Sequence, residues 1–315
     1  MRQVLAEGKV FGPTKFSLIK SKMKKYKYAY IMIGLVAVYY GIFMYAPMYG
    51  ALIAFKDYSP AQGFLKSPWA GMKHFTALFT SPSFFKLLRN TLMISFYDIL
   101  FNFPAPIILA LMLNEVSSRW FKGIVQTVSY LPRFISVVVI CGIVKAFLMN
   151  DGMVNNVIFA LSGEKLKFLQ TAAYFRSIYI ISEIWQTVGW NSIIFYAAIT
   201  AVDPQLNEVC VIEGGGKLAQ MRHVTLPCIM PTIMVMLILK IGSVLNVGFE
   251  KIILLYNPNT YETADVILSF VYRKGILEQN YSYATAVEIF NSVVNFILLI
   301  GANTLSKKIN ETGLW

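Results

Sequence analysis

Six long apolar stretches, separated by shorter polar segments, dominate the pattern of this chain. A membrane-spanning helix needs about 17 to 25 mostly apolar residues, and each stretch meets that length. The pattern predicts six spans, at residues 28–47, 90–113, 124–149, 177–200, 227–255 and 283–305. The predicted fold class is therefore an all-α membrane protein with six transmembrane helices, and little chain remains for a soluble domain.

Composition and charge agree with a membrane protein. Of the 315 residues, 57% are hydrophobic and only 14% are charged, whereas about a quarter of the residues in a soluble domain are charged. The net charge of +12 would suit nucleic-acid binding, but much of it lies in a basic arm, residues 1–27, directly before the first apolar stretch. Such an arm is typical of a cytoplasmic flank that faces anionic lipid. We therefore expect membrane lipid as a partner, and no nucleic acid.

The orientation follows from the same basic residues. The arm places the N-terminus on the cytoplasmic side, and six spans return the C-terminus there, in agreement with Lys307 and Lys308 after the last span. Four lysines in the predicted outer loop, residues 55–89, run against this rule. No small-residue cleavage site follows the first apolar stretch, so we expect it to remain as an anchor. The predicted organisation is a basic arm at 1–27 and a membrane domain at 28–315.

The loop between the fourth and fifth spans has room for a structure of its own. Asp203 followed by Pro204 is a helix-start signal, because the carboxylate can accept an unpaired backbone N–H and proline suits the first turn. A helix is predicted from there to about Glu213. Three glycines from Gly214 onward favour a sharp turn before a second helix begins at Lys217. The residues themselves leave two interpretations open: a docking knob for another protein, or a flexible linker.

The GGGK sequence in this loop, residues 201–226, resembles a phosphate-binding loop only at first sight. A P-loop needs G-x-x-x-x-G-K-[ST] between a strand and a helix. Here Val211 stands in place of the first glycine, Leu218 follows the lysine, and no strand is predicted before it. The loop is therefore not expected to bind a nucleotide.

Few residues point to catalysis or metal binding. The three cysteines have no metal-ligand spacing, and His74 and His223 are predicted on opposite sides of the membrane. No nucleophile motif or dinucleotide fingerprint is present. No catalytic residue, metal site or cofactor is expected on this chain.

Two charged residues fall near the middle of predicted spans. Asp98 lies in the second span and Lys240 in the fifth. Charged groups at this depth are costly and usually face a cavity or a partner. Our hypothesis is that both border a solute path, either paired or each satisfied by polar neighbours. The alternative is an ion pair or polar network that fixes helix packing and never contacts a solute.

The loop motif also carries a family resemblance. Glu208, Gly214 and the run Val224-Thr225-Leu226-Pro227 resemble the EAA motif of permease subunits in bacterial binding-protein-dependent ABC importers, with the same spacing. The chain departs from that motif at four places, with Val209 and Cys210 for two alanines, Glu213 for aspartate and Val224 for isoleucine. Further stretches, such as "APMYGALIAFKDYSP", "FPAPIILALMLNEV" and "LNVGFEKIILLYNP", are similar to the LplB-type branch of carbohydrate permeases, related to the maltose-importer permeases. The resemblance covers residues 24–315.

The resemblance implies a transport complex in the bacterial cytoplasmic (inner) membrane. In such a complex a second, homologous permease completes the pore, two separate subunits bind ATP and Mg and hydrolyse the ATP, and an external solute-binding protein delivers an oligosaccharide or complex glycan. This chain would be a multi-pass subunit without an enzymatic activity of its own. The EAA loop would form a coupling helix that fits a cleft on the ATPase. The residues assigned to this contact are Glu208, Glu213, Gly214, Gly215 and Lys217.

Polar and aromatic side chains in the later spans could contact such a carbohydrate. Sugars are held by amides and carboxylates through their hydroxyls, and their apolar faces rest on aromatic rings. Besides Asp98 and Lys240, the candidates are Glu183, Trp190 and Asn191 in the fourth span, Asn246 and Glu250 in the fifth, and Asn291 and Asn295 one turn apart in the sixth. Each could instead join helices, because interhelical amide hydrogen bonds are common in membrane bundles.

Two other functions compete with this interpretation. In an ion-coupled secondary transporter, Asp98, Glu183 and Lys240 would form a proton or sodium relay, and the protein would need no docking loop. A membrane-embedded enzyme of glycan or lipid metabolism would need carboxylates or histidines converging at one interface, and the sequence does not provide them.

Overall fold

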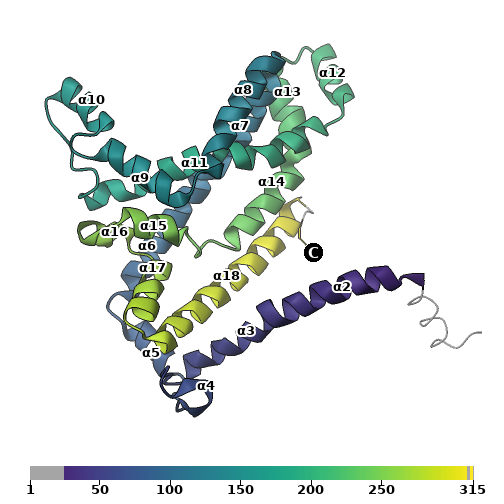
Figure 1. Cartoon of the computed structure of the whole chain (residues 1–315). Helices are drawn as coiled ribbons and strands as arrows, with labels where there is room; N and C mark the ends of the chain where they lie inside the picture. Colours follow the sequence, from purple (N-terminus) through teal and green to yellow (C-terminus); the bar gives the residue numbers. More distant parts are fainter. Residues whose placement is uncertain (1–24, 311–312, 315) are drawn as a thin grey trace, which may run out of the picture. The chain divides into compact units, whose positions relative to one another are not determined.

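The computed structural model describes residues 25–310 and 313–314 (Figure 1). Most of the basic arm predicted at 1–27 lies outside the described residues. The chain divides into two units after Leu52. The first unit is helical from Lys27 onward, with α2 (Lys27–Tyr40), a π-helical turn (Gly41–Tyr45), α3 (Ala46–Met48) and the start of a 3-10 helix (Tyr49–Phe55).

Helix α2 is apolar on all sides. Its sequence, KYAYIMIGLVAVYY, places no charged residue after Lys27, and none of its side chains is buried within the chain. A helix that is hydrophobic all round is typical of a membrane span. This matches the first predicted span.

The second unit is also helical, and no β-strand occurs in the described residues apart from an isolated bridge between Lys56 and Trp69. Four elements precede the centre of the chain: α4 (Gly63–Lys66), α5 (Lys73–Thr80), α6 (Phe84–Tyr97) and α7 (Pro104–Glu115). The central helices are α8 (Arg119–Tyr130), α9 (Val137–Leu148), α10 (Met153–Ser162) and α11 (Ala172–Thr200). The remaining helices are α12 (Pro204–Ile212), α13 (Lys217–Gln220), α14 (Leu226–Ile241), α15 (Phe249–Leu255), α16 (Tyr261–Ala264), α17 (Ile267–Tyr272) and α18 (Tyr281–Asn310).

Five helical stretches among the described residues are long and apolar enough to cross a membrane: Lys27–Phe55, Phe84–Glu115, Val137–Ser162, Lys217–Ile241 and Tyr281–Lys308. Helix α11 coincides with the span predicted at 177–200 and has 29 residues, but it is not among the five. Polar side chains in its middle, including Glu183, Gln186 and Asn191, lower its hydropathy.

Two predicted spans were wrong as continuous helices. The span at 124–149 is interrupted, because α8 ends at Tyr130 and Pro132 lies in a short 3-10 helix. Proline removes a backbone donor and disfavours the helical conformation of the residue before it. Ser136 then caps a new helix, α9, by accepting a hydrogen bond from the backbone N–H of Val139.

The span at 227–255 is interrupted after α14 ends at Ile241, and α15 begins only at Phe249. Side chains from other helices satisfy backbone groups of the intervening segment, residues 242–248. Asn295 accepts the N–H of Leu245 at 3.0 Å, and the Ser95 hydroxyl donates to the carbonyl of Val244. Irregular backbone within a membrane protein is tolerated where such partners or a polar cavity are available.

Helix α11 runs through the second unit and holds it together. It packs against α7 along much of its length and also contacts α8 and α14. Phe195 and Ile199 of α11 join Ile107 and Ile229 in one buried apolar cluster, and Tyr179 belongs to another. Helices α14 and α18 lie side by side (Figure 1). The polar middle of α11 is thus placed among the helices that carry the other intramembrane charges.

Candidate functional site

A polar cavity of about 190 Å³ lies between α6, α11 and α14 and is closed on one side by the irregular segment 242–248. Its walls include Asp98, Tyr179, Glu183, Lys240 and Asn246. Four of these were expected near a solute path from sequence. The cavity therefore joins residues that lie far apart along the chain.

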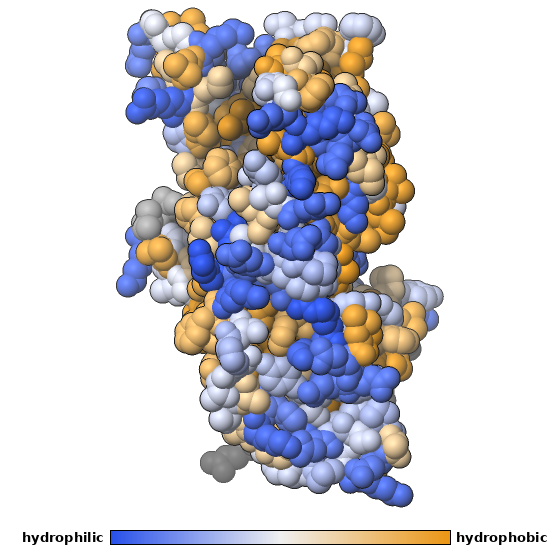
Figure 2. Space-filling view, turned by 90° about the vertical axis from the view of Figure 1, so that its left-hand side faces the viewer, coloured by the Kyte–Doolittle hydropathy of each residue, from blue (hydrophilic) through white to orange (hydrophobic). Residues whose placement is uncertain are grey.

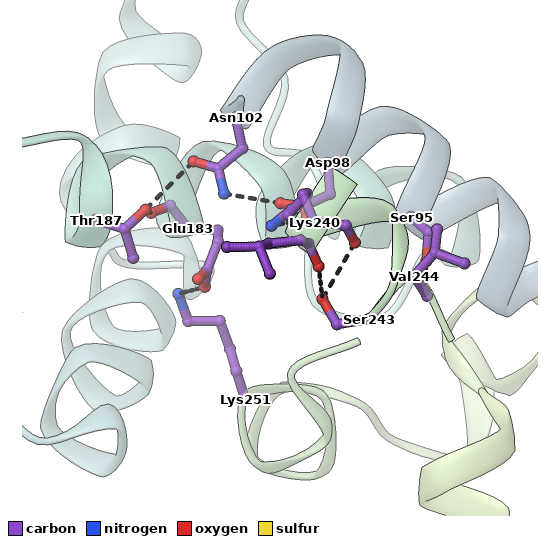
Figure 3. Close-up of polar contacts among 10 residues, drawn as sticks. Ser95, Asp98, Asn102, Glu183, Thr187, Lys240, Ser243, Val244 and Lys251 are labelled. Carbon is purple, nitrogen blue, oxygen red and sulfur yellow. Dashed lines mark hydrogen bonds and ion pairs between the residues drawn. The ribbon is translucent and has the colours of Figure 1, made fainter. Parts of the chain in front are cut away.

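Asp98 and Lys240 form an ion pair, as Figure 3 shows. Asp98 opens a π-helical turn, Asp98–Asn102, between α6 and α7, and Lys240 lies in the last turn of α14. The free carbonyl groups at a helix C-terminus favour a cation there. Of the two side chains, Lys240 is the more accessible, with 35% of its surface exposed against 16% for Asp98.

A chain of two hydrogen bonds, from Thr187 through Asn102, supports Asp98 (Figure 3). The amide of Asn102 donates to the Asp98 carboxylate at 2.7 Å, and the hydroxyl of Thr187 donates to the Asn102 carbonyl oxygen at 3.3 Å. Asn102 and Thr187 are both buried. The carboxylate is thus held in place by a partner other than Lys240.

Glu183 has a different partner, one that sequence reasoning missed. Its carboxylate accepts a hydrogen bond from the ammonium group of Lys251 at 2.6 Å, and the two form an ion pair. Only 3% of the Lys251 side chain is exposed. The ring of Tyr179 lies 6.0 Å from the same ammonium group. Lys251 lies in the apolar run "FEKIILL", so the sequence indicated a need for a charged partner as clearly for Lys251 as for Lys240. The assumption of one uninterrupted span placed Lys251 at its far end and hid the need for a partner.

Three of the four predicted asparagines come together, and they hold the irregular segment against α18. Asn246 accepts hydrogen bonds from the amides of Asn291 at 2.7 Å and Asn295 at 3.2 Å. Both α18 asparagines are buried, whereas Asn246 is exposed at the cavity. In this arrangement Asn291 and Asn295 join α18 to the irregular segment 242–248, and Asn246 is the one that a solute in the cavity could reach.

The remaining candidates lie elsewhere. Asn191 is exposed and lines a second cavity of about 290 Å³, whose wall also includes Lys240. Trp190 packs edge-to-face on Phe134 at 5.7 Å, and Glu250 is exposed in the first turn of α15. Neither Trp190 nor Glu250 is part of the wall of these two cavities.

The loop at 201–226 has the local structure predicted from sequence. The Asp203 carboxylate caps α12 by accepting the N–H of Gln205 at 3.0 Å. Gly214 has a φ of +83°, a conformation that glycine adopts without strain and β-branched residues avoid. A second helix, α13, begins at Lys217. The ammonium group of Lys217 forms an ion pair with Glu115, at the end of α7, at 3.0 Å.

The helix before this turn is uncovered. No residue of α12 is buried, and Glu208 and Glu213 are exposed. Four apolar side chains of α12 are also exposed, among them Ile212 with 84% of its surface accessible. Gly215 instead lies against α12, because an added Cβ would come within 2.5 Å of the Cys210 sulfur. The arrangement can present an apolar helix and a tight turn to another protein.

Among the described residues, no group of three histidine, cysteine, aspartate or glutamate side chains is placed to hold a metal ion. The chemistry available at the cavity is ion pairing and hydrogen bonding.

Comparison with known proteins places these features in a family. The sequence model for the binding-protein-dependent transport system inner membrane component matches residues 102–311. The chain is 45% identical to Protein LplB of Bacillus subtilis (strain 168) over 93% of its own length and 92% of that protein. It is also 45% identical to the polygalacturonan/rhamnogalacturonan transport system permease protein YteP of the same organism, over 97% and 96% of the two chains.

Solved structures agree. The chain is 42% identical to a chain in the crystal structure of a bacterial ABC transporter involved in the import of the acidic polysaccharide alginate, with a TM-score of 0.86. The match covers 93% of this chain and 99% of the other. The same similarity holds for the alginate transporter in complex with a periplasmic protein that carries an alginate pentasaccharide.

Proposed function

This chain belongs to the binding-protein-dependent transport system inner membrane components and is an importer permease subunit, and we propose that it carries oligosaccharides derived from complex glycans. Support for this substrate class comes from the polygalacturonan and alginate systems of its relatives. On this proposal the chain forms half of a pore, a homologous second permease forms the other half, and a solute-binding protein outside the membrane delivers the oligosaccharide.

The observation that carries the proposal is the uncovered helix α12. Its exposed apolar residues have no cover within the described chain, and such a surface on a stable protein marks an interaction site. We assign it to a cleft on an ATP-hydrolysing subunit that binds ATP and Mg. In this contact α12 and its turn supply Glu208, Glu213, Gly214, Gly215 and Lys217.

The proposed topology has six spans with both termini in the cytoplasm of a bacterium. The five apolar stretches supply five spans, and α11 supplies the other. Its polar middle suits a helix whose inner face borders a cavity rather than lipid. Figure 2 shows a face on which hydrophilic residues form a broad band and hydrophobic residues lie along its edges. This distribution suits a subunit that combines lipid contact with protein and water contact.

The solute path in this proposal passes the polar cavity. Asp98, Glu183, Lys240 and Asn246 face it, and Asn191 follows on the side of the second cavity. One helical rod, Lys217–Ile241, joins α13 to α14 over 25 residues, roughly 37 Å at 1.5 Å per residue. A displacement of the glycine turn at residues 214–216, here called the coupling turn, would therefore be transmitted to Lys240 through continuous helix.

The test compares two valine substitutions in the coupling turn. Gly214→Val forces a β-branched residue into a positive φ, whereas Gly216, with a φ of −77° and no neighbour within 4 Å of an added Cβ, should accept valine. We expect Gly214→Val to lower ATPase co-purification and ATP-driven uptake by at least about fivefold, because about 1–2 kcal/mol of backbone strain would displace the turn. Gly216→Val should remain close to wild type.

The secondary-transporter alternative predicts a different pattern. It requires uptake by this chain alone, abolished by ionophores, and no difference between the two valine variants. Equal uptake and ATPase binding by both variants and wild type would remove the coupling assignment.

A further inference from the structure

Lys240 lies in the walls of both cavities, the polar one of 190 Å³ and the largely apolar one of 290 Å³. It belongs to the wall of the 190 Å³ cavity with Asp98 and Glu183, and to the wall of the 290 Å³ cavity with Asn102 and Asn191. Each cavity is large enough for several water molecules, which occupy about 30 Å³ each in the liquid. The Lys240 ammonium group can therefore be hydrated or bind a solute from either side.

The second lysine of the site has no such freedom. Only 3% of the Lys251 side chain is exposed, against 35% for Lys240, and its ammonium group is enclosed by Glu183 and the ring of Tyr179. Among the described residues that line the two cavities, Lys240 is the cation that a solute can reach. Lys251 has the fixed position expected of a structural ion pair.

The partner of Lys240 is built to remain when the pair separates. Asp98 keeps the hydrogen bond from Asn102, whose orientation is set by Thr187. The hydrogen bond from Asn102 remains if Lys240 moves away, so separation of the ion pair would not leave the Asp98 carboxylate without a partner. A buried charge that loses all its partners is destabilising by several kcal/mol, and Asn102 limits that cost here.

Charge balance then distinguishes two kinds of solute. Two carboxylates, Asp98 and Glu183, line the 190 Å³ cavity, and each pairs with a lysine, of which only Lys240 is also part of the cavity wall. A neutral sugar carries no negative charge that could replace the Asp98 carboxylate, so it leaves the ion pair between Asp98 and Lys240 intact. A sugar carboxylate that enters the cavity can form an ion pair with the Lys240 ammonium group and so replace Asp98 as its partner.

We propose that Lys240 is the specificity-determining residue for acidic oligosaccharides, which bind in the cavity when a uronate carboxylate replaces Asp98 as the partner of Lys240. This inference rests on the proposed function and adds the charge of the substrate and the group that recognises it. The exchange is non-covalent and transfers no proton, so the solute remains an anion throughout.

The test measures direct binding to the purified complex in nanodiscs, without the solute-binding protein, so that only the membrane site can select. The probes are trigalacturonate and its fully methyl-esterified form, which share size and hydroxyl pattern and differ in charge. Saturation-transfer NMR detects millimolar binding of both. For wild type we expect the uronate to bind about tenfold more tightly than the ester, which corresponds to about 1.4 kcal/mol.

The decisive variant is the double substitution Asp98→Asn with Lys240→Met, which removes both charges and avoids an unpaired one. We expect its ratio of affinities to fall close to one. Lys240→Arg should retain a preference for the uronate, because the guanidinium group also binds carboxylates. Parallel substitution of the exposed pair Lys274 and Glu278 controls for a loss of charge elsewhere.

Each outcome decides the inference. An unchanged preference for the uronate in the double variant would show that Lys240 does not select, and so would equal binding of both probes to wild type. Neither result would affect the proposed import of oligosaccharides, since the ester still binds. If wild type binds neither probe, and the complete complex with its solute-binding protein imports neither, the proposed function and this inference both fail.

Discussion

The buried ion pair of Glu183 and Lys251 should respond unequally to loss of either partner. Glu183→Leu leaves an ammonium group that is 3% exposed, and an uncompensated buried charge costs about 3–5 kcal/mol. Lys251→Met leaves a carboxylate that is 24% exposed and borders the 190 Å³ cavity. Water can reach this carboxylate, so the expected cost is about 1–3 kcal/mol. The double variant should be more stable than Glu183→Leu alone, because no charge is left behind.

The assay is the apparent Tm of the detergent-solubilised protein, followed by tryptophan fluorescence. The expected order of Tm is wild type and the double variant highest, Lys251→Met next and Glu183→Leu lowest. Lys274→Met is the matched control: its pair with Glu278 has the same 2.6 Å separation but is exposed, so the change should stay within about 0.5 kcal/mol. If the double variant is as unstable as Glu183→Leu, or the two single variants are equal, then burial of the lysine does not govern the cost.

Two further predictions concern regions away from the cavity. Gly189→Ala should sharply reduce the yield of folded protein in a detergent-stability assay, because the added Cβ would lie 2.2 Å from the backbone oxygen of Ser129, and Gly123→Ala, with no neighbour within 4 Å, should not. In the loop after the first apolar stretch, the hydrogen bond from Lys73 lowers the pKa of Asp57. The stability that this carboxylate contributes is therefore present above its ordinary pKa of 3.8 and should be lost as pH falls through the lower folded value. Comparing Tm against pH for wild type and Asp57→Asn should show a small acid-dependent difference, and parallel curves would contradict it.

Hydrophobic periodicity was sufficient to predict the helices and insufficient to predict their interruptions. Sequence predicts a continuous span through residues 242–248 because most of them are small or apolar. Taken alone, an irregular backbone there would leave N–H and C=O groups unpaired within the membrane, at a cost of several kcal/mol each. The side chains that satisfy it, Ser95 and Asn295, come from helices far away in sequence. A single sequence carries no signal that joins them, so the break could be found only in three dimensions.

The candidate site was predictable to the extent that charge in an apolar stretch is unusual. Asp98 and Lys240 were identified because each needs a partner at membrane depth, and the structure pairs them. Lys251 also lies in an apolar run and needs a partner, but Glu183 was expected to contact a solute and was not matched with it. Asn102 and Thr187 were missed because uncharged polar residues are common in membrane helices, and their role appears only through their contact with Asp98.

On the two proposals above, the position of Lys240 would connect substrate recognition to the coupling loop. The rod from Lys217 to Ile241 is not uniform, since a π-helical turn at Met221–Thr225 and Pro231 both interrupt its regular hydrogen bonding. Such interruptions are where helices bend. A movement of α12 can therefore change the direction of α14 as well as its position, and a small rotation at its last turn would separate Lys240 from Asp98, which Asn102 holds in place. On this view the ion pair is broken by the same motion that admits or releases the solute, so a carboxylate on the solute takes over the lysine when Asp98 loses it.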